Sequence, residues 1–254
     1  MMQIHAIPAF RDNYIWALAS GRQAAVVDPG EAAPVEAFLA AHGLELCAVL
    51  ATHHHADHVG GLPELVRHWR CPTFGPAREV PSGIDTRLSE GDHIAVPGLD
   101  LALGVLDIPA HTAGHIAFVG DGMVFCGDTL FACGCGRIFE GTAAQMADSL
   151  GKLARLPAAT RVYCGHEYTL ANIAFAEAVE PGNRELAARR LREAAKRERG
   201  EPTLPSTIAE ELATNPFVRC SEPEVIASAE RHAGGPLADA VAVFAELREW
   251  KNAF

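Results

Sequence analysis

The stretch Thr52-His53-His54-His55-Ala56-Asp57-His58 gathers more metal-binding side chains than any other segment of its length in the chain. It follows the apolar residues 48–51, which predict a buried strand that runs directly into a loop. In an extended backbone, alternate side chains point to the same side, so His53 and His55 face one way and His54 faces the other. The stretch therefore predicts two imidazoles side by side at the end of a strand.

Asp57 and His58 supply a second group of ligands just before the turn-forming Val59-Gly60-Gly61. Imidazole and carboxylate together suit borderline divalent metals such as zinc, manganese or iron. An isolated histidine is most often an ordinary core or surface side chain. Four ligand-type residues within six positions, directly after a strand, favour a metal site instead.

The length and composition are those of a globular enzyme. The 254 residues suffice for one large domain or two modest ones. Hydrophobic residues make up 49% of the chain and charged residues 21%, so a substantial core is available and a folded chain is expected.

The charge of the chain opposes binding of nucleic acid. The formal net charge is -11, and two bound dications would still leave it at -7. A nucleic-acid partner requires a basic footprint, so none is expected here. A local basic patch for a small anion remains compatible with this overall charge.

The chain also lacks sequence features of export. The first residues show no basic segment followed by a long apolar one, so we expect no signal peptide. No run is apolar enough to span a membrane, so no membrane partner is expected. The seven cysteines have no disulfide-framework spacing, which predicts reduced thiols and a cytoplasmic protein.

Strands and helices alternate over the first part of the chain. Residues 24–27 and 44–51 are predicted strands, and residues 32–42 and 62–69 are predicted helices. This order suggests sheet layers covered by helices. Residues 71–91 are rich in Pro, Gly and Ser and predict a loop with one short strand.

Four separate predicted strands end in a possible metal ligand. The loop of His53 follows one strand, and His111, Asp128 and His166 follow three others. Functional side chains usually lie on loops that a rigid scaffold positions. We therefore expect these four strand ends to meet at one site.

The composition changes after Glu167, where Ala, Glu and Arg become frequent. Helices are predicted at residues 171–179 and 185–199, within 203–217, and at 237–251. We therefore expect two domains, a metal-binding catalytic domain at residues 1–168 and a helical substrate-binding domain at residues 169–254.

Residues 184–199 carry seven basic and three acidic side chains. Glu185 with Arg189, and Glu193 with Arg197, have the i,i+4 spacing of exposed helix pairs. We interpret this segment as a solvated helix face, with a membrane-surface or nucleic-acid role as a minor alternative.

Several motifs together resemble the metallo-β-lactamase superfamily. They are the stretch at residues 52–58, His111-Thr112-Ala113-Gly114-His115, Gly127-Asp128-Thr129 and Cys164-Gly165-His166-Glu167-Tyr168. Further stretches narrow the resemblance to glyoxalase II, also called hydroxyacylglutathione hydrolase. They are PAFRDNY at residues 8–14, GCGRIFEG at 134–141, EPGN at 180–183, GEPT at 200–203, NPF at 215–217 and REWK at 248–251. The match runs nearly end to end. It implies an α/β fold, a four-layer αβ/βα sandwich followed by a small α-helical C-terminal domain.

The resemblance implies a ligand set, position by position. One metal ion takes His53, His55 and His111; the other takes Asp57, His58 and His166; and Asp128 bridges them. Asp57 and Asp128 are the implied catalytic residues, which hold a water or hydroxide between the metals. The implied cofactors are two divalent metal ions per chain, zinc in the first place, with iron and manganese as alternatives.

The same ligands suit thioester hydrolysis on chemical grounds. Two dications roughly 3.5–4 Å apart lower the pKa of a bridging water and clamp an acyl centre. A metal can also stabilise the tetrahedral oxyanion. A thiolate is a good leaving group, so no Ser-His-Asp triad is required, and the chain has no Gly-x-Ser-x-Gly motif.

Five residues are the implied substrate-binding set: Arg137, Phe139, Tyr168, Arg248 and Lys251. Glutathione carries two carboxylates, and Arg binds a carboxylate with two parallel hydrogen bonds. Arg248 and Lys251 lie three apart, on one face of a predicted helix. Without the resemblance, a solvated helix end is the more common explanation of such a pair. The family often has Lys and Tyr in place of Arg137 and Phe139, so a hydrogen bond at residue 139 is lost here.

The function implied is hydrolysis of S-(2-hydroxyacyl)glutathione, typically S-D-lactoylglutathione, to the 2-hydroxy acid and glutathione, the second step of methylglyoxal detoxification. The partner is then a glutathione thioester, and we expect a monomer. One alternative is a glutathione persulfide dioxygenase with a single iron, and another is a non-catalytic metal-binding module of the same fold. A β-lactamase is disfavoured by the absence of an export signal, and a nuclease by the net charge.

The remaining candidates are expected to be structural. His115 lies within a motif, and we expect it to make a structural hydrogen bond, whereas His54 should point away from the metals. Asp28 ends a strand and is interpreted as a turn residue. Cys133-Gly134-Cys135 lacks the second cysteine pair of a structural zinc site.

Overall fold

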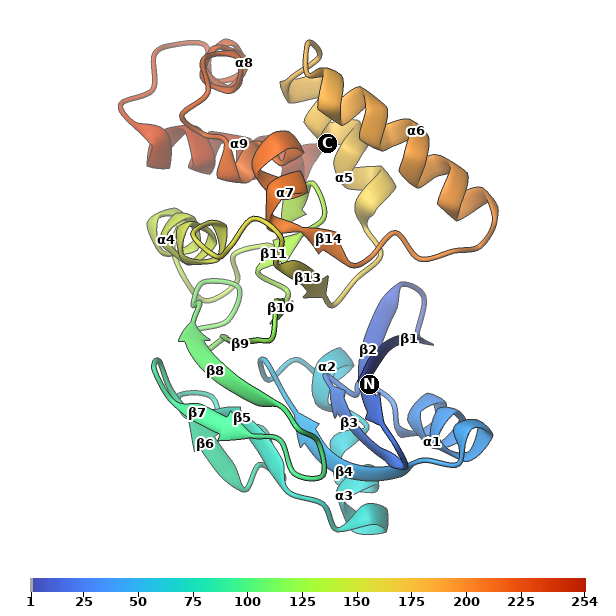
Figure 1. Cartoon of the computed structure of the whole chain (residues 1–254). Coiled ribbons are helices and arrows are strands. Elements are labelled where there is room, and N and C mark those ends of the chain that lie inside the picture. The colour runs from blue at the N-terminus through green and yellow to red at the C-terminus, as the bar shows by residue number, and fades with distance from the viewer. Residues whose placement is uncertain (1) are drawn as a thin grey trace.

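The computed structural model describes residues 2–254, which form two facing six-stranded sheets and a helical C-terminal part (Figure 1). The first sheet has the strand order β1 (Gln3–Ala9), β2 (Asn13–Ser20), β3 (Gln23–Val27), β4 (Glu45–Leu50), β5 (Thr73–Pro76) and β6 (Thr86–Leu88). The strands β1 to β3 pair antiparallel, and β3 to β6 pair parallel. The helices of this half are α1 (Ala32–His42), α2 (Ala56–Val59) and α3 (Leu62–Trp69).

The second sheet has the order β14 (Ser206–Thr207), β13 (Arg161–Cys164), β10 (Met123–Gly127), β9 (Ile116–Gly120), β8 (Ala102–Asp107) and β7 (His93–Ala95). A small hairpin of β11 (Leu130–Phe131) and β12 (Gly134–Cys135) follows β10, and α4 (Ala143–Ala154) comes next. The helical part holds α5 (Thr169–Val179), α6 (Arg184–Glu198), α7 (Ile208–Thr214), the 3-10 helix η1 (Pro216–Val218), α8 (Pro223–Ala233) and α9 (Ala240–Ala253).

Strand β2 shows how one strand serves two hydrophobic layers. Trp16 and Leu18 belong to the main core, which lies between the two sheets and continues to α4 and α9. Ile15 and Ala17 alternate with them and face the other way, into the layer that α1 and α3 cover. The order of layers is helix, sheet, sheet, helix, so the expected four-layer sandwich with a helical C-terminal part is confirmed.

Most of the predicted elements are present. Helix α1 ends at Gly43, whose φ of 63° is the left-handed conformation that a glycine cap adopts at low cost. The prediction of a single short strand within residues 71–91 was wrong, because this segment contains two strands, β5 and β6. Three helices were missed: the short α2, which was expected to be loop, and α4 and α8, which carry visible start signals. Helix α4 begins with a capping box of Thr142 and Gln145, and α8 begins with Pro223.

The interpretation of residues 184–199 as a solvated face was wrong for two side chains. Arg189 and Glu193 are both buried. Arg189 donates to Oε1 of Glu211 at 2.8 Å and to the hydroxyl of Thr214 at 2.7 Å. The i,i+4 spacing conceals this pairing because the partners come from α7, not from the same helix.

Among residues 2–254, no helix combines the length and the apolar character that are needed to cross a membrane.

Candidate metal centre

Four strand ends meet at the edge of the two sheets, as the sequence predicted. The loop after β4 carries His53 and His55, and the segment after β8 carries His111. Asp128 follows β10, and His166 follows β13. Gly165 allows the close approach, because a Cβ atom there would lie 2.6 Å from Oδ1 of Asp128.

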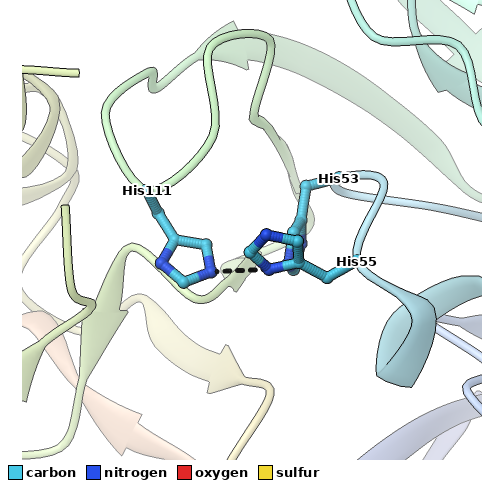
Figure 2. Close-up of side chains that lie close together, drawn as sticks. All are labelled: His53, His55 and His111. Atoms are coloured by element: carbon cyan, nitrogen blue, oxygen red, sulfur yellow. Dashed lines mark hydrogen bonds between the residues drawn. The ribbon is translucent and has the colours of Figure 1, made fainter. Parts of the chain in front are cut away.

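His53, His55 and His111 form the first ligand group (Figure 2). One ring nitrogen of each lies within 4.8 Å of the others. Nδ1 of His55 and Nε2 of His111 are 3.1 Å apart. The structure thus brings together the three imidazoles that the sequence assigned to one ion.

Asp57, His58 and His166 form the second ligand group. Oδ2 of Asp57 lies 3.6 Å from Nε2 of His58 and 3.4 Å from Nε2 of His166. One carboxylate and two imidazoles therefore converge, again as a set that the sequence assigned to one ion.

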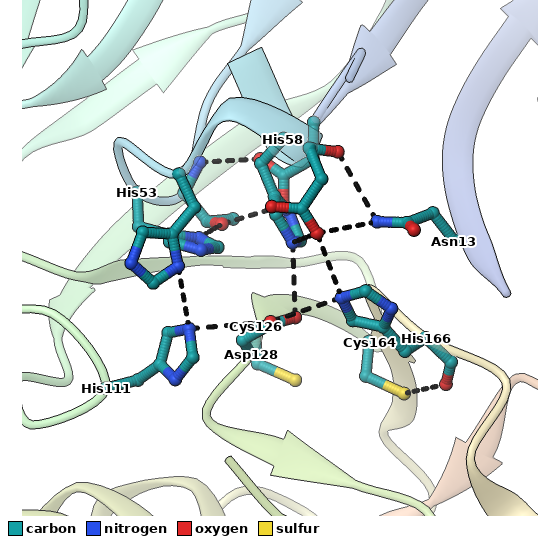
Figure 3. A network of polar contacts seen from close by, with 12 residues as sticks. Asn13, His53, His58, His111, Cys126, Asp128, Cys164 and His166 are labelled. Atoms are coloured by element: carbon teal, nitrogen blue, oxygen red, sulfur yellow. Dashed lines mark hydrogen bonds and ion pairs between the residues drawn. The ribbon is translucent and has the colours of Figure 1, made fainter. Parts of the chain in front are cut away.

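The carboxylate of Asp128 lies between the two groups (Figure 3). Its Oδ2 is 3.5 Å from Nε2 of His111 in the first group and 3.2 Å from Nε2 of His166 in the second. Its Oδ1 is 3.3 Å from Nε2 of His58. This side chain is positioned to contact ions in both groups.

Hydrogen bonds fix the orientation of three of the ligand rings. Nδ1 of His58 donates to Oδ2 of Asp28 at 3.0 Å, and Nδ1 of His111 donates to the carbonyl of Arg137 at 2.8 Å. Nδ1 of His166 donates to Oδ1 of Asp12 at 2.8 Å. Because these oxygen atoms only accept, each Nδ1 carries the proton and each Nε2 presents a lone pair to the centre.

Thr52 extends the same arrangement to His53. Its hydroxyl donates to Oδ2 of Asp28 at 2.7 Å and lies 3.0 Å from Nδ1 of His53. Since the hydroxyl proton is already used, the oxygen accepts from Nδ1. Nε2 of His53 is therefore also free to bind a metal.

The unpaired atoms of the centre fit metal ions. Nε2 of His53, Nε2 of His58 and Oδ1 of Asp128 are buried and have no hydrogen-bond partner among residues 2–254. Leaving such atoms unpaired in the interior costs about 1–3 kcal/mol each. Imidazole nitrogen and carboxylate oxygen are common ligands of divalent metals. The two groups, joined by Asp128, fit two metal ions.

The electrostatic environment favours the ligand forms of His53, Asp57 and Asp128. Burial lowers the pKa of His53 well below its ordinary value, so this ring is neutral. The neighbouring ring of His166, with Nε2 3.4 Å from Oδ2, holds the pKa of Asp57 below its usual range. Burial alone disfavours charge on Asp128, but the neighbouring His58 and His166 outweigh it and hold its pKa low. Both carboxylates are therefore anionic at neutral pH.

Four supporting residues were not identified from the sequence as parts of the centre: Asp12, Asn13, Asp28 and Thr52. Asp28 had been interpreted only as a turn residue, but its carboxylate also orients His58 and Thr52. Nδ2 of Asn13 donates to Oδ2 of Asp57 at 3.0 Å. For Asp28 the available signal was its position. It follows β3, which pairs with β4, the strand that leads to the candidate ligands.

The expectations for His115 and His54 are confirmed. Nε2 of His115 accepts from the backbone N–H of Asp128 at 3.2 Å, so this ring supports a ligand. The ring of His54 turns away from both ligand groups and contacts Glu140 at 3.0 Å. None of the ligand groups found among residues 2–254 contains a cysteine, and Cys126 and Cys164 are buried free thiols.

A cavity of about 590 Å³ opens beside the metal centre. Asp57, Asp128 and His166 line one part of it. The five predicted substrate-binding residues also line it: Arg137, Phe139, Tyr168, Arg248 and Lys251. One cavity therefore connects the ligand groups to the predicted substrate cations.

The two cations on α9 are not a solvated helix end. Arg248 is 6% exposed and donates to the carbonyl of Cys135 at 2.9 Å, whereas its Nε is buried without a partner in the described chain. Nζ of Lys251 donates to the carbonyl of Ala171 at 3.2 Å and lies 5.1 Å from the ring centre of Phe175. Burial and the nearby Arg248 lower the pKa of Lys251 to about 8.

The aromatic residues of the cavity lie against the ligand rings. Tyr168 stacks on His166, with ring centres 4.7 Å apart and an angle of 5° between the planes. Phe139 is 61% exposed, and its ring meets those of His111 and His55 edge-on, at 5.2 Å and 5.7 Å. Phe139 therefore forms part of the rim beside the first ligand group.

Two family models match the chain, and together they cover nearly all of it. The model described as the metallo-β-lactamase superfamily matches residues 9–166. The model described as the hydroxyacylglutathione hydrolase C-terminus matches residues 167–254. A hydroxyacylglutathione hydrolase of Alkalilimnicola ehrlichii is 59% identical over 99% of both chains. The chain belongs to the hydroxyacylglutathione hydrolase family. Another member, from Nitrosomonas europaea, is 53% identical over 100% of this chain and 97% of its own.

Several solved structures share this fold. ETHE1 from Myxococcus xanthus superposes with a TM-score of 0.68 and 26% identity, covering 98% of this chain and 90% of its own. TTHA1623, solved in a di-iron-bound form, has a TM-score of 0.52 and 28% identity, covering 65% of this chain and 91% of its own. The BLEG-1 B3 metallo-β-lactamase, 19% identical with a TM-score of 0.62 over 86% of this chain and 99% of its own, shows the fold alone.

Proposed function

We propose that this chain hydrolyses S-(2-hydroxyacyl)glutathione, typically S-D-lactoylglutathione, to the 2-hydroxy acid, D-lactate, and glutathione. This reaction is the second step of methylglyoxal detoxification. The observation that carries the proposal is that Asp57, Asp128, Arg248 and Lys251 all line the same cavity. Membership of the hydroxyacylglutathione hydrolase family supports it.

The proposed cofactors are two divalent metal ions, zinc in the first place, with iron or manganese as alternatives. His53, His55 and His111 would hold the first ion, Asp57, His58 and His166 would hold the second, and Asp128 would contact both. When bound, such a pair lowers the pKa of a water molecule and polarises an acyl carbonyl.

Asp57 and Asp128 are the proposed catalytic residues. Both carboxylates line the cavity and lie within 3.6 Å of ligand imidazoles. These contacts hold the imidazole rings in position relative to the carboxylates. A carboxylate oxygen of this pair accepts a hydrogen bond from the attacking water and takes its proton as the water oxygen bonds to the thioester carbonyl carbon. The C–S bond then breaks and glutathione leaves as its thiolate, a good leaving group that needs no general acid.

Arg137, Tyr168, Arg248 and Lys251 are the proposed glutathione-binding residues, and Phe139 completes the rim. Glutathione has two carboxylates, and Arg248 offers a buried guanidinium with an unpaired Nε beside the cavity. Lys251 adds a second cation one turn further along α9. Binding at these cations places the thioester toward Asp128.

We propose that the chain has two domains with separate roles, as the sequence suggested. Residues 1–168 supply the metal ligands, and residues 169–254 form the glutathione-binding domain. Support comes from the position of Arg248 and Lys251 on α9 and from β14, through which the helical part adds a strand to the second sheet.

We also propose that the protein is a cytoplasmic monomer. Side chains of a single chain line the whole cavity, so the site is complete without a partner. All seven cysteines are free, which suits a reducing compartment.

The alternatives fit the site less well. A glutathione persulfide dioxygenase needs one redox iron, whereas both ligand groups here are intact and joined by Asp128. A non-catalytic module would be expected to lose a ligand, whereas this chain retains all seven, in the two ligand groups and at Asp128. The high identity to hydroxyacylglutathione hydrolases does not favour either alternative.

The test is thioester hydrolysis with metals counted in the same preparation. Purified protein is assayed by the loss of thioester absorbance with S-D-lactoylglutathione. Two metal ions per chain and rapid hydrolysis that a chelator abolishes are the expected results. A fully metallated protein that leaves the thioester intact, but consumes oxygen with glutathione persulfide, would overturn the proposal.

A further inference from the structure

Glu79 connects the two loops that carry the first ligand group. It lies between β5 and β6, outside every motif discussed above. Its Oε1 accepts from the backbone N–H of His54 at 3.2 Å and from the hydroxyl of Thr112 at 2.7 Å. Its Oε2 accepts from the backbone N–H of Gly114 at 2.6 Å. One carboxylate therefore joins the loop of His53 and His55 to the loop of His111.

Glu140 makes a second connection between the same loops. Its Oε1 lies 3.0 Å from Nε2 of His54, and its Oε2 accepts from the backbone N–H of Ala113 at 2.8 Å. His54 is thus held by Glu79 at its backbone and by Glu140 at its ring. His54, Glu79 and Glu140 could also be viewed as metal ligands. Each carboxylate oxygen, however, already accepts at least one hydrogen bond from the protein.

Gly114 gives independent support for a built contact. A Cβ atom at this position would lie 2.7 Å from Cγ of Glu79, closer than real Cβ contacts. The loop that follows His111 therefore passes against the carboxylate at a distance that only glycine permits.

His55 explains why such a connection is needed. His53, His58, His111 and His166 each have Nδ1 fixed by a hydrogen bond, which leaves Nε2 for the metal. His55 is different, because its Nδ1 faces the ligand group at 3.1 Å from His111. No atom of residues 2–254 hydrogen-bonds its Nε2. The position of this ring therefore depends on its backbone, and the adjoining residue is His54.

We propose that Glu79 and Glu140 are positioning residues that clamp His54 to residues 112–114 and thereby hold His55 opposite His111. The clamp acts on the three-histidine group and not on the group of Asp57, His58 and His166. It rests on the proposed two-metal function and specifies how one of the two ions is retained.

The first experiment compares metal retention in Glu79→Gln and in the wild-type protein. An amide has one acceptor oxygen, so it leaves at least one of the donors of His54 and Gly114 facing an N–H group. Metal ions per chain are counted after dialysis against a graded chelator series. Glu79→Gln should lose one ion at about tenfold lower chelator concentration than the wild type, while the second ion is retained. Glu140→Gln should show the same loss to a smaller extent.

Glu90→Gln is the matched control. Glu90 accepts the backbone N–H of Asp107 at 2.6 Å and contacts Lys152 at 3.1 Å, so it also joins two segments, β8 and α4, within residues 1–168. It touches neither ligand loop. Glu90→Gln should keep both ions at the chelator strength that removes one from Glu79→Gln.

Steady-state kinetics provide a second readout. The kcat of Glu79→Gln for S-D-lactoylglutathione should fall about tenfold and recover in excess zinc. Its KM should stay within about twofold of the wild type, because Arg248 and Lys251 lie on α9, outside the two loops that Glu79 joins. Equal metal retention in Glu79→Gln, Glu90→Gln and the wild type would overturn the clamp. A wild-type protein without two ions or without hydrolysis would instead overturn the proposed function.

Thr112 supplies a test that avoids a carboxylate substitution. Thr112→Val removes only the hydroxyl that donates to Glu79, and Thr112→Ser retains it. Thr112→Val should lose the same single ion as Glu79→Gln at a milder chelator concentration than the wild type, and Thr112→Ser should match the wild type. Indistinguishable metal retention in these two variants would contradict the clamp even if Glu79→Gln did not fold.

Discussion

The ring of His58 and the carboxylate of Asp28 are joined by a buried hydrogen bond of 3.0 Å. The same carboxylate accepts the N–H and the hydroxyl of Thr52, each at 2.7 Å, and that hydroxyl in turn accepts from His53. One residue therefore fixes the tautomer of a ligand in each of the two groups. Asp28 is a support common to both metal sites.

Asp28→Asn should weaken both metal sites. An amide cannot accept all three donors, so one of Thr52 and His58 is left facing an N–H group. Loss of such a supporting partner typically lowers metal affinity about 10–100-fold. Chelator competition on the purified variant measures this change. Asp85→Asn is the control, because Asp85 accepts from Thr73 in the same half of the molecule, away from the ligands. Wild-type affinity in Asp28→Asn would contradict the role of Asp28.

Asp128→Ala should cause a larger loss than Asp28→Asn. The substitution removes a carboxylate that lies within 3.5 Å of imidazoles in both ligand groups. Because even supporting residues cost about 10–100-fold in metal affinity or activity, a direct ligand should cost more than about 100-fold in kcat. The metal content should also fall below two ions per chain. An Asp128→Ala protein with two tightly bound metals and the wild-type rate would exclude a bridging role.

The convergence of the candidate ligands could be predicted from the sequence because their positions are local. His53, His55, Asp57 and His58 lie within one short stretch between β4 and the end of α2, and the other candidate ligands each follow a strand. The order of buried strands and turn residues was enough to place them at the same edge of the sheets.

The supporting residues could not be predicted, because their partners are distant in the sequence. Asp28 lies 30 positions from His58, and Asp12 lies 154 from His166. No periodicity or spacing links such residues before the sheets assemble. The buried pair of Arg189 and Glu211 was missed for the same reason, since local spacing offered an exposed partner instead.

Arg248→Ala should mainly raise KM. The guanidinium lines the cavity about where a glutathione carboxylate is proposed to bind, away from the reacting atoms. Charge-assisted hydrogen bonds contribute about 1.5–3 kcal/mol, so KM for S-D-lactoylglutathione should rise about 10–100-fold with little change in kcat. Arg248→Lys retains the charge but not the two parallel hydrogen bonds. Its KM should therefore lie between those of the wild type and Arg248→Ala. An unchanged KM in Arg248→Ala, in protein with a normal melting temperature, would show that Arg248 does not bind the substrate.

Lys251 should make substrate binding depend on pH. Its pKa is lowered to about 8, so its positive charge is present below that pH and is lost as the pH rises through it. KM for the thioester should therefore increase above pH 8, and should do so less in Lys251→Arg, which stays charged. A pH profile of KM for both proteins is the measurement. Profiles that coincide between pH 7 and 9 would contradict the assignment.

The same shift has a defined effect on stability. The pKa of Lys251 in the folded protein lies below its unfolded value of 10.5. Between these two pH values the unfolded chain binds more protons than the folded chain, so this group makes the protein more stable as the pH rises from about 8. Urea unfolding of the wild type and Lys251→Met at pH 7.5 and 9.5 separates this contribution from the other titrating groups. The opposite sign would exclude a lowered pKa.

Phe139→Tyr should lower KM without changing stability. Phe139 is 61% exposed on the rim of the cavity, 5.2 Å from the ring of His111, so an added hydroxyl can point into solvent or toward a bound substrate. One hydrogen bond contributes about 0.5–1.5 kcal/mol, which corresponds to a KM about two- to tenfold lower. Phe139→Leu, which offers no hydroxyl, is the control. If Phe139→Tyr and Phe139→Leu change KM for S-D-lactoylglutathione in the same direction, the residue does not contribute through a hydrogen bond, and its effect on the substrate is one of shape alone.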